Sequence, residues 1–262
     1  MKRREFFSTA AAAGTLPLAG LASAAEQNDG RQFIELVKIH TNVGAGRGRL
    51  LDFYRDVAVP AYNRLGIKSV GVFTVQFGNT DPTLYVLLPH ESLVSLVTLR
   101  RRFLDDEEVK SRGRGIIDAP LDRPAYVRME SSLMLTFAKM AKVEVPSALL
   151  DNPSRLYELR IYQSHSNAAA VKKIEMFNEG GEIQIFRDTG LQPVFFGETL
   201  VGPDMPNLTY MLVFDGMESR YASWDRFRTD PAWLKLREDP QYADTVSNVT
   251  DIILRPASFS QI

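Results

Sequence analysis

An internal repeat constrains the fold of this chain more than any other feature of its 262 residues. Matching segments recur at a nearly constant offset of 123 to 125 residues, and each contains a similar mixture of apolar and charged positions. Self-similarity at a fixed spacing indicates that one structural unit occurs twice. The matched pairs are Phe33–Leu36 with Leu156–Leu159, Thr83–Leu87 with Leu208–Val213, and Arg102–Asp106 with Arg226–Asp230.

Each copy predicts the order strand, helix, strand, strand, helix, strand. In the first copy, alternating or dense β-favouring residues predict strands, and apolar positions three and four residues apart predict helices. Pro60 should kink the first helix, and Ser92 is a plausible cap for the second. The predicted strands are 33–40, 70–77, 83–88, 126–136, 156–163, 194–201, 208–214 and 246–254, and the helices are 49–65, 93–103, 217–228 and one capped by Asn167.

This order is the ferredoxin-like α+β order. A four-stranded sheet with helices on one face leaves its other face exposed, and a second copy can bury that face. Because both sheets lie on one chain, we expect tandem ferredoxin-like domains that form an intrachain dimeric α+β barrel. The predicted divisions are an export signal over 1–24, a first repeat over 32–137, a linker over 138–154 and a second repeat over 155–257.

The first 24 residues predict export. Lys2, Arg3 and Arg4 precede an apolar stretch over 10–21, and Ala22-Ser23-Ala24 supplies small residues at a cleavage site. The arginine pair resembles a twin-arginine signal, which predicts a periplasmic or extracellular protein with no membrane attachment after cleavage. A retained membrane anchor is the alternative, although the stretch is shorter than the ~20 strongly apolar residues of a stable span.

Composition excludes several classes of function. The chain is 45% hydrophobic and 24% charged with a formal net charge of −1, which is typical of a globular protein without a nucleic-acid-binding surface. It contains no cysteine, so disulfides, thiolate catalysis and zinc–thiolate sites are excluded.

The second repeat resembles a NIPSNAP domain, a branch of the dimeric α+β barrel folds. The resemblance lies in Tyr157–Tyr162 (Tyr-Glu-Leu-Arg-Ile-Tyr), Gly190, Arg220 and Asp230–Trp233 (Asp-Pro-Ala-Trp). It implies the barrel fold but no reaction, because the family has no settled activity. The first repeat departs from this pattern, since Val37 stands where Arg160 does.

Strand alternation suggests a ligand site in the second repeat. Tyr157, Leu159 and Ile161 share one face of the predicted strand, and Glu158, Arg160 and Tyr162 share the other. We expect the apolar set to pack on the helices and the polar set to point into the barrel beside Glu35, where it could position an anionic or polar ligand. A structural ion pair is the alternative, because buried charges must be paired in either case.

Histidines supply the other candidates. His40 and His165 each follow the first strand of a repeat, near a barrel mouth, where either could act as a general base or an axial haem ligand. A surface or loop role is the alternative for both, and His90 reads as structural. No metal site and no cofactor are predicted, with haem as the alternative, and no catalytic triad is present.

These features favour an exported protein that binds a small, partly apolar molecule in its barrel, as a monomeric pseudo-dimer or a homo-oligomer. Whether it is an enzyme is left open. The alternatives are a cofactor-free oxygenase or isomerase, a haem-binding enzyme, and a structural or partner-binding module.

Overall fold

The computed structural model describes residues 29–42, 44–78 and 82–262. The predicted export signal lies outside these residues. Within them, each repeat has the predicted order of strands and helices, and short helices follow the second helix of each copy. The predicted domain boundaries themselves stay a prediction.

In the first repeat the strands are β1 Phe33–His40, β2 Gly71–Phe77, β3 Thr83–His90 and β4 Arg128–Thr136. Its helices are α1 Ala45–Phe53, the π-helical turn η2 Tyr54–Ala58, α2 Val59–Arg64, α3 Leu93–Asp105, α4 Glu107–Arg112 and α5 Arg114–Ile117.

In the second repeat the strands are β5 Leu156–Gln163, β6 Gln192–Val201, β7 Asn207–Phe214 and β8 Asn248–Pro256. Its helices are α6 Asn167–Asn178, α7 Glu182–Asp188, α8 Met217–Thr229, α9 Pro231–Arg237 and the 3-10 turn η5 Pro240–Tyr242. Between the repeats lie two further 3-10 turns, η3 Ala138–Met140 and η4 Ser147–Leu149.

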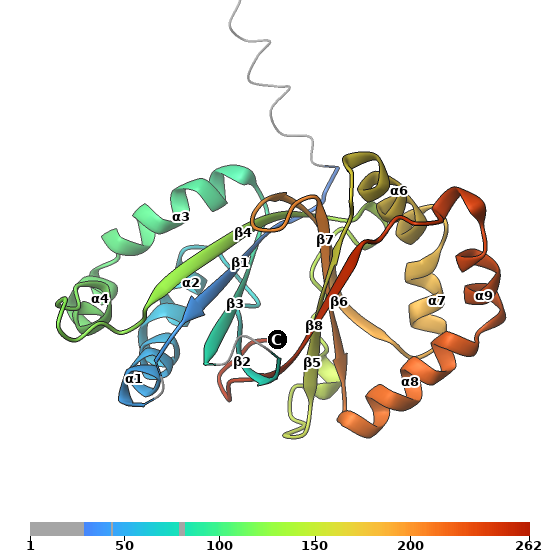
Figure 1. Cartoon of the computed structure of the whole chain (residues 1–262). Coiled ribbons are helices and arrows are strands. Elements are labelled where there is room, and N and C mark those ends of the chain that lie inside the picture. The colour runs from blue at the N-terminus through green and yellow to red at the C-terminus, as the bar shows by residue number, and fades with distance from the viewer. Residues whose placement is uncertain (1–28, 43, 79–81) are drawn as a thin grey trace, which may run out of the picture.

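The eight strands form one closed barrel in the order β1-β3-β2-β8-β5-β7-β6-β4. The two four-stranded sheets join along two edges, where β2 pairs with β8 and β4 pairs with β6. The helices of the first repeat cover the barrel on one side and those of the second cover it on the other (Figure 1). The predicted intrachain α+β barrel is therefore confirmed, and closure leaves no unpaired sheet edge.

The core has three parts. One cluster of buried side chains fills the barrel interior, and it includes Tyr157, Leu159, Phe195 and the C-terminal Ile262, each 0% exposed. Two other clusters lie between the sheet and the outer helices, one in each repeat. The barrel interior is thus filled with apolar side chains.

Helix caps support the repeat. Asp106 accepts hydrogen bonds from the backbone at the start of α4, and Asp230 does the same at the start of α9. Ser92 caps α3 as predicted. The predicted cap Asn167 was wrong, because Ser166 accepts the hydrogen bond from the Ala169 amide and Asn167 is the first helical residue.

A π turn interrupts the first helix on the N-terminal side of Pro60. Residues Tyr54–Ala58 form this turn, and α2 begins at Val59, one residue before the proline. Proline cannot donate to the carbonyl four residues earlier, and a π turn shifts the hydrogen-bond pattern around that gap. As a result Tyr54 and Tyr62 lie on one interrupted helix.

Strand registers correct one of the sequence matches. Leu88 lies opposite Glu35, and Leu212 lies opposite Glu158, so β3 and β7 correspond at an offset of 124. The tyrosines of the matched segments are therefore not equivalent. Tyr85 belongs to the barrel-interior cluster, whereas Tyr210 belongs to the cluster under the helices.

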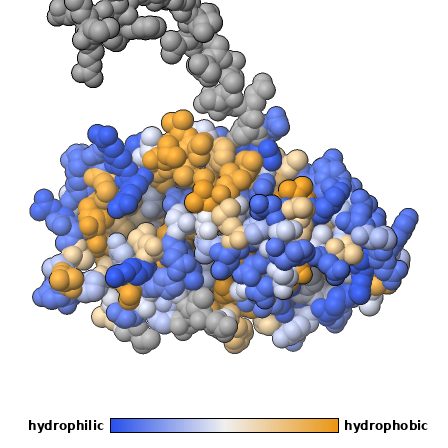
Figure 2. Space-filling view, turned by 45° about the horizontal axis from the view of Figure 1, so that its top comes forward, coloured by the Kyte–Doolittle hydropathy of each residue, from blue (hydrophilic) through white to orange (hydrophobic). Residues whose placement is uncertain are grey.

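The surface is largely hydrophilic, with a hydrophobic region on the face that Figure 2 shows. Exposed apolar side chains include Leu93, Val94 and Val97 at the start of α3 and Val201 and Met205 near the β6–β7 hairpin. None of the helices in the described ranges has the length and apolar character needed to cross a membrane.

Candidate functional site

The polar face of β5 points at the helices, which reverses our expectation. Tyr157 and Leu159 pack in the barrel interior, whereas Glu158 and Arg160 contact α8. Alternation correctly separated the two sets. It could not tell which set faces inward, because the helices carry charged partners that no local pattern reveals.

Glu158 is the centre of a buried ion network under α8. Arg220 donates to both carboxylate oxygens at 2.9 and 2.7 Å, and Arg160 donates to Oε1 at 2.8 Å. The indole Nε1 of Trp224 donates at 2.7 Å. Burial alone would raise the pKa of Glu158, but the Arg220 hydrogen bond and the Arg160 charge hold it below its usual value. This carboxylate is fully committed to protein partners.

Arg160 and Tyr162 join the same network. The Arg160 guanidinium lies over the Trp224 ring at 4.8 Å and within 5.5 Å of the Tyr162 ring centroid. The Tyr210 hydroxyl donates to the Tyr162 hydroxyl at 2.9 Å. The structure therefore brings Glu158, Arg160 and Tyr162 together, and the contacts around them are those of a structural ion pair.

Glu35 is the counterpart of Glu158 in the first repeat, and it lies on the other side of the molecule. The two carboxylates occupy matching registers in β1 and β5. Glu35 accepts a hydrogen bond from the Ser131 hydroxyl at 2.7 Å. The expectation that Glu35 lies beside Glu158 was wrong, because each carboxylate faces the helices of its own repeat.

The two arginines that hydrogen-bond to Glu158 are replaced by apolar residues in the first repeat. Arg100 and Arg128 line the cavity of that repeat, but in the described part of the chain neither forms a hydrogen bond or ion pair with Glu35. Val37 replaces Arg160 on the strand. Helices α3 and α8 have the same length and correspond at an offset of 124, which places Leu96 at the position of Arg220 and the exposed Arg100 at that of Trp224. Burial raises the pKa of Glu35 above its usual value, against the opposing effect of the Ser131 hydrogen bond.

Glu35 opens onto a cavity of about 610 Å³ between the sheet and the helices of the first repeat. The side chain of Glu35 is 22% exposed. Its wall is mixed: apolar surface comes from Val37, Ile39, Leu50, Phe53, Leu99 and Phe103, and charged groups besides Glu35 come from Arg100, Arg128 and Glu130. A pocket of this size that combines apolar walls with convergent polar groups is typical of a small-molecule site.

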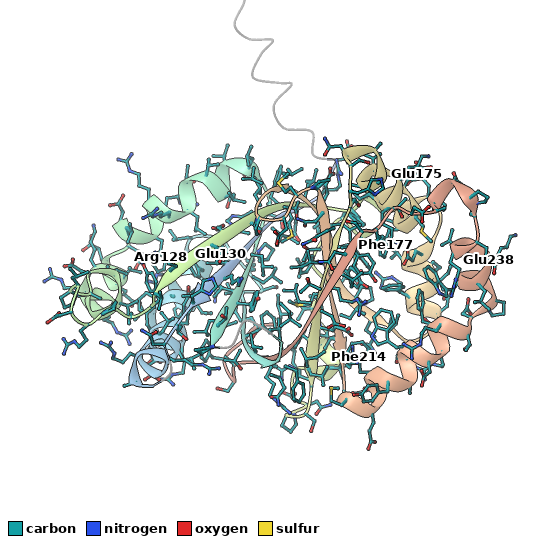
Figure 3. The ribbon with its side chains drawn as sticks, in the orientation of Figure 1. Arg128, Glu130, Glu175, Phe177, Phe214 and Glu238 are labelled. Carbon is teal, nitrogen blue, oxygen red and sulfur yellow. The ribbon has the colours of Figure 1, made fainter. Side chains whose placement is uncertain are left out.

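The same layer of the second repeat is filled. Phe177 packs against Phe196 and Tyr210 with ring centroids 5.1 and 5.7 Å apart, and Phe186 packs against Phe227 at 4.8 Å. Figure 3 labels Phe177 in the space between α6 and the sheet. One repeat therefore has a solid aromatic core where the other has a cavity.

Phenol groups supply further polar atoms to the cavity. Tyr54 and Tyr62 both line it, from the interrupted helix that faces the sheet. Burial raises the pKa of both phenols, and the nearby Glu35 charge raises it further. Both therefore remain protonated hydrogen-bond donors at neutral pH.

His90 lies behind Glu35 at the end of β3. Its Nδ1 lies 3.1 Å from the Ser95 hydroxyl, and its Nε2 lies 3.9 Å from Glu35 Oε2. Burial lowers the pKa of His90 to about 4, so the ring is neutral at pH 7. It therefore gives Glu35 no compensating charge.

The other two histidines do not line the cavity, although His40 contacts Glu130, which does. His40 Nε2 is 2.5 Å from Glu130 Oε1, and Lys38 Nζ is 3.6 Å from the other oxygen of Glu130. Figure 3 labels Glu130 and Arg128 on β4. Lys38 and His40 alternate with Glu35 and so share the barrel face of β1. His165 is exposed in the turn between β5 and α6.

The residues present do not fit a haem in the cavity. None of the three histidines is among its lining residues, so neither His40 nor His165 can serve as an axial ligand there. In the ranges that the structure describes, no group of three or more His, Asp or Glu side chains could hold a metal ion.

Sequence reasoning missed most of the cavity. The sequence predicted Glu35 as a site residue but placed it in the barrel interior, and it did not identify Tyr54, Tyr62 or Ser131. One signal was available, because Val37 replaces Arg160 while Glu35 remains a glutamate. An acid retained without its cation indicates a different environment for that acid.

Comparisons with known proteins agree with this fold. The chain matches a candidate monooxygenase from Fusobacterium nucleatum with a TM-score of 0.56 at 9% identity, covering 86% of this chain and 92% of that one. A candidate monooxygenase from Lactobacillus acidophilus matches with a TM-score of 0.53 at 9% identity, covering 86% and 94%. These likenesses concern the fold alone.

A shorter structure matches part of the chain. A NIPSNAP-like domain protein from Burkholderia xenovorans is 23% identical over 41% of this chain and 90% of that chain, with a TM-score of 0.37. A search of curated proteins finds no match. The NIPSNAP family model matches residues 157–261, which lie in the second half of the α+β barrel.

Proposed function

We propose that the first repeat binds a small, partly apolar molecule in the cavity beside Glu35. One observation carries this proposal: Glu35 and Glu158 occupy the same position, but in the described part of the chain no arginine or lysine hydrogen-bonds to Glu35, which faces a cavity. Partial burial of a carboxyl without a bonded cation costs stability. A ligand that hydrogen-bonds to it would offset that cost.

The proposed location differs from the barrel interior that the sequence suggested. Apolar side chains fill the interior, whereas the cavity lies outside the barrel under α1–α3. The second repeat then acts as the rigid half of the scaffold. Because the barrel closes within one chain, we propose that a monomer is sufficient for binding.

The proposed setting is an exported one. It depends on the arginine pair and the apolar stretch in the first 24 residues. Fusing residues 1–30 to a reporter that requires folded export, with Arg3→Lys and Arg4→Lys together as the control, tests it. Export that is unaffected by the double substitution would contradict the twin-arginine route.

Ligand binding can be tested with 2-naphthol, a fluorescent molecule with an apolar body and one hydroxyl. Titration of the mature protein should show saturable binding that Leu99→Trp abolishes, because Leu99 lines the cavity and is 3% exposed. Val171→Trp is the matched control on an exposed helix position. Equal binding by all three proteins would place the ligand elsewhere and contradict the proposal.

A second candidate is an enzyme without a bound cofactor that acts in the same cavity. The raised pKa of Glu35 favours it, because a carboxyl that titrates nearer to neutral pH is better suited to proton transfer.

A further inference from the structure

We propose that Glu35, Tyr54 and Tyr62 form a proton-transfer site for a small apolar ketone. Glu35 would act as the base at the carbon next to the carbonyl. Tyr62, whose oxygen accepts a hydrogen bond from the Tyr54 hydroxyl, would donate its own hydrogen to the carbonyl oxygen. This inference rests on the proposed function, since it requires that the ketone bind in the cavity.

The position of Glu35 suits a base. Its carboxyl accepts one hydrogen bond, from Ser131, and part of it is exposed to the cavity. The counterpart Glu158 accepts hydrogen bonds from two arginines and an indole, which leave it no free lone pair for a substrate. Neutral His90 stands behind Glu35 without forming a salt bridge. The proton that Glu35 takes therefore stays on its carboxyl.

The phenol groups are suited to stabilising negative charge on the carbonyl oxygen of a bound ketone. Tyr54 and Tyr62 line the cavity from the helix side, and Glu35 lines it from the sheet side. A flat ketone lying between the two layers would present its carbonyl oxygen to the helix and its acidic carbon to the sheet. Protonated phenols in a partly apolar pocket stabilise an enolate more strongly than water does, because they are already oriented.

The step is balanced without another reactant. The Glu35 carboxylate forms an O–H bond as the C–H bond beside the carbonyl breaks, and that electron pair forms the C=C bond of the enolate. The carbonyl π electrons move to oxygen, where the phenols hold the charge. Return of the proton to the same carbon gives exchange, and return to the far carbon of an adjacent double bond gives an isomer.

Hydrogen–deuterium exchange of 2-tetralone in D₂O tests the proposal, with proton NMR following loss of the C1 signal. The wild-type protein should accelerate exchange over buffer. Glu35→Gln should lower the protein-dependent rate by about 100-fold or more. Tyr62→Phe should lower it by about 100-fold, and Tyr54→Phe, which removes only the hydrogen bond to Tyr62, should lower it less. Glu91→Gln, an exposed carboxylate outside the cavity, is the control and should leave the rate unchanged.

Saturation-transfer NMR on the same samples separates binding from catalysis. If 2-tetralone binds to the wild type but not to Leu99→Trp, and exchange is not accelerated, the proton-transfer proposal is wrong while ligand binding stands. Acceleration that survives Glu35→Gln also overturns it. If neither binding nor acceleration occurs, both proposals fail. Circular dichroism of each variant establishes that a lost rate does not reflect unfolding.

Discussion

Glu35 and Glu158 occupy equivalent registers of β1 and β5 but have opposite pKa shifts. Glu158 receives hydrogen bonds from Arg220, Arg160 and Trp224. Glu35 receives one from Ser131 and faces a cavity. Within one chain, the same residue in the same fold position is thus enclosed by hydrogen-bond donors in one repeat and faces a cavity in the other.

Removing the charge of each glutamate should have opposite effects on stability. Glu158→Gln leaves Arg220 without its counter-ion and leaves Arg160 with the exposed Asp251 alone, so we expect the free energy of unfolding to fall by about 3 kcal/mol. Glu35→Gln removes a partly buried carboxylate without a bonded cation and should leave stability unchanged or raise it. Urea unfolding at pH 7 measures both, and a large loss for Glu35→Gln would show that Glu35 is a structural residue.

The effect of Glu35 on stability should depend on pH in one direction. Its folded-state pKa is raised, so the native protein holds this proton more tightly than the unfolded chain does. Stability from Glu35 is therefore present below the unfolded pKa of about 4.3 and is lost as pH rises through the folded pKa. The free energy of unfolding of Glu35→Gln minus that of the wild type should increase with pH across that window and then become constant. Unfolding free energies at closely spaced pH values from 4 to 8 would reveal it, and a constant difference would contradict it.

Glu158 should show the reverse dependence. Its folded-state pKa is lowered, so its contribution is present above the unfolded pKa and is lost as pH falls through the folded one. The loss of unfolding free energy caused by Glu158→Gln should therefore become smaller at acidic pH. The same pH series measures this, and a deficit that persisted at the lowest pH would assign the effect to packing instead of charge.

Val37→Arg should convert the first repeat toward the second. Val37 has the strand position of Arg160, whose NH1 lies 2.8 Å from Glu158. We expect the new guanidinium to enter the cavity, to lower the pKa of Glu35 and to abolish 2-naphthol binding. Carbon-13 NMR titration of labelled glutamate follows the pKa. Val37→Met is the control, since it fills volume without charge and should leave the pKa of Glu35 raised.

Removing an aromatic side chain should lower stability more in the filled layer of the second repeat than beside the cavity of the first repeat. Phe177 is 0% exposed within the aromatic cluster, whereas Phe53 lines the cavity. Phe177→Ala should lower the free energy of unfolding by about 4 kcal/mol and Phe53→Ala by about 2 kcal/mol, because fewer contacts are lost where space already exists. Equal losses in denaturant unfolding would indicate that the two layers are packed alike.

Substitutions in the buried ion pair Lys173–Glu182 should have non-additive effects on the free energy of unfolding. Lys173 Nζ lies 2.7 Å from Glu182 Oε2, both side chains are nearly inaccessible, and burial raises the pKa of Glu182 despite the lysine. Lys173→Met leaves an uncompensated buried carboxylate and should cost about 3 kcal/mol, while adding Glu182→Leu should restore most of it. A double-mutant cycle measures the coupling, and strictly additive losses would exclude it.

Local sequence was sufficient for the repeat, the order of strands and helices, and barrel closure. Periodicity and β-favouring segments act within a few residues, and two sheets with exposed faces have one obvious way to bury them. The match of Arg102–Asp106 with Arg226–Asp230 was informative for the same reason, since both aspartates cap the following helix. The bounds of β5 were predicted without error.

Tertiary structure alone decided which face of each strand turns inward and which layer is hollow. Alternation gives two faces but no direction, because direction depends on partners distant in sequence, such as Arg220 for Glu158. The cavity likewise arises from missing partners: Val37 and Leu96 stand where arginines stand in the second repeat. A charge's pKa follows from every group packed around it, and that set exists only after the chain has folded.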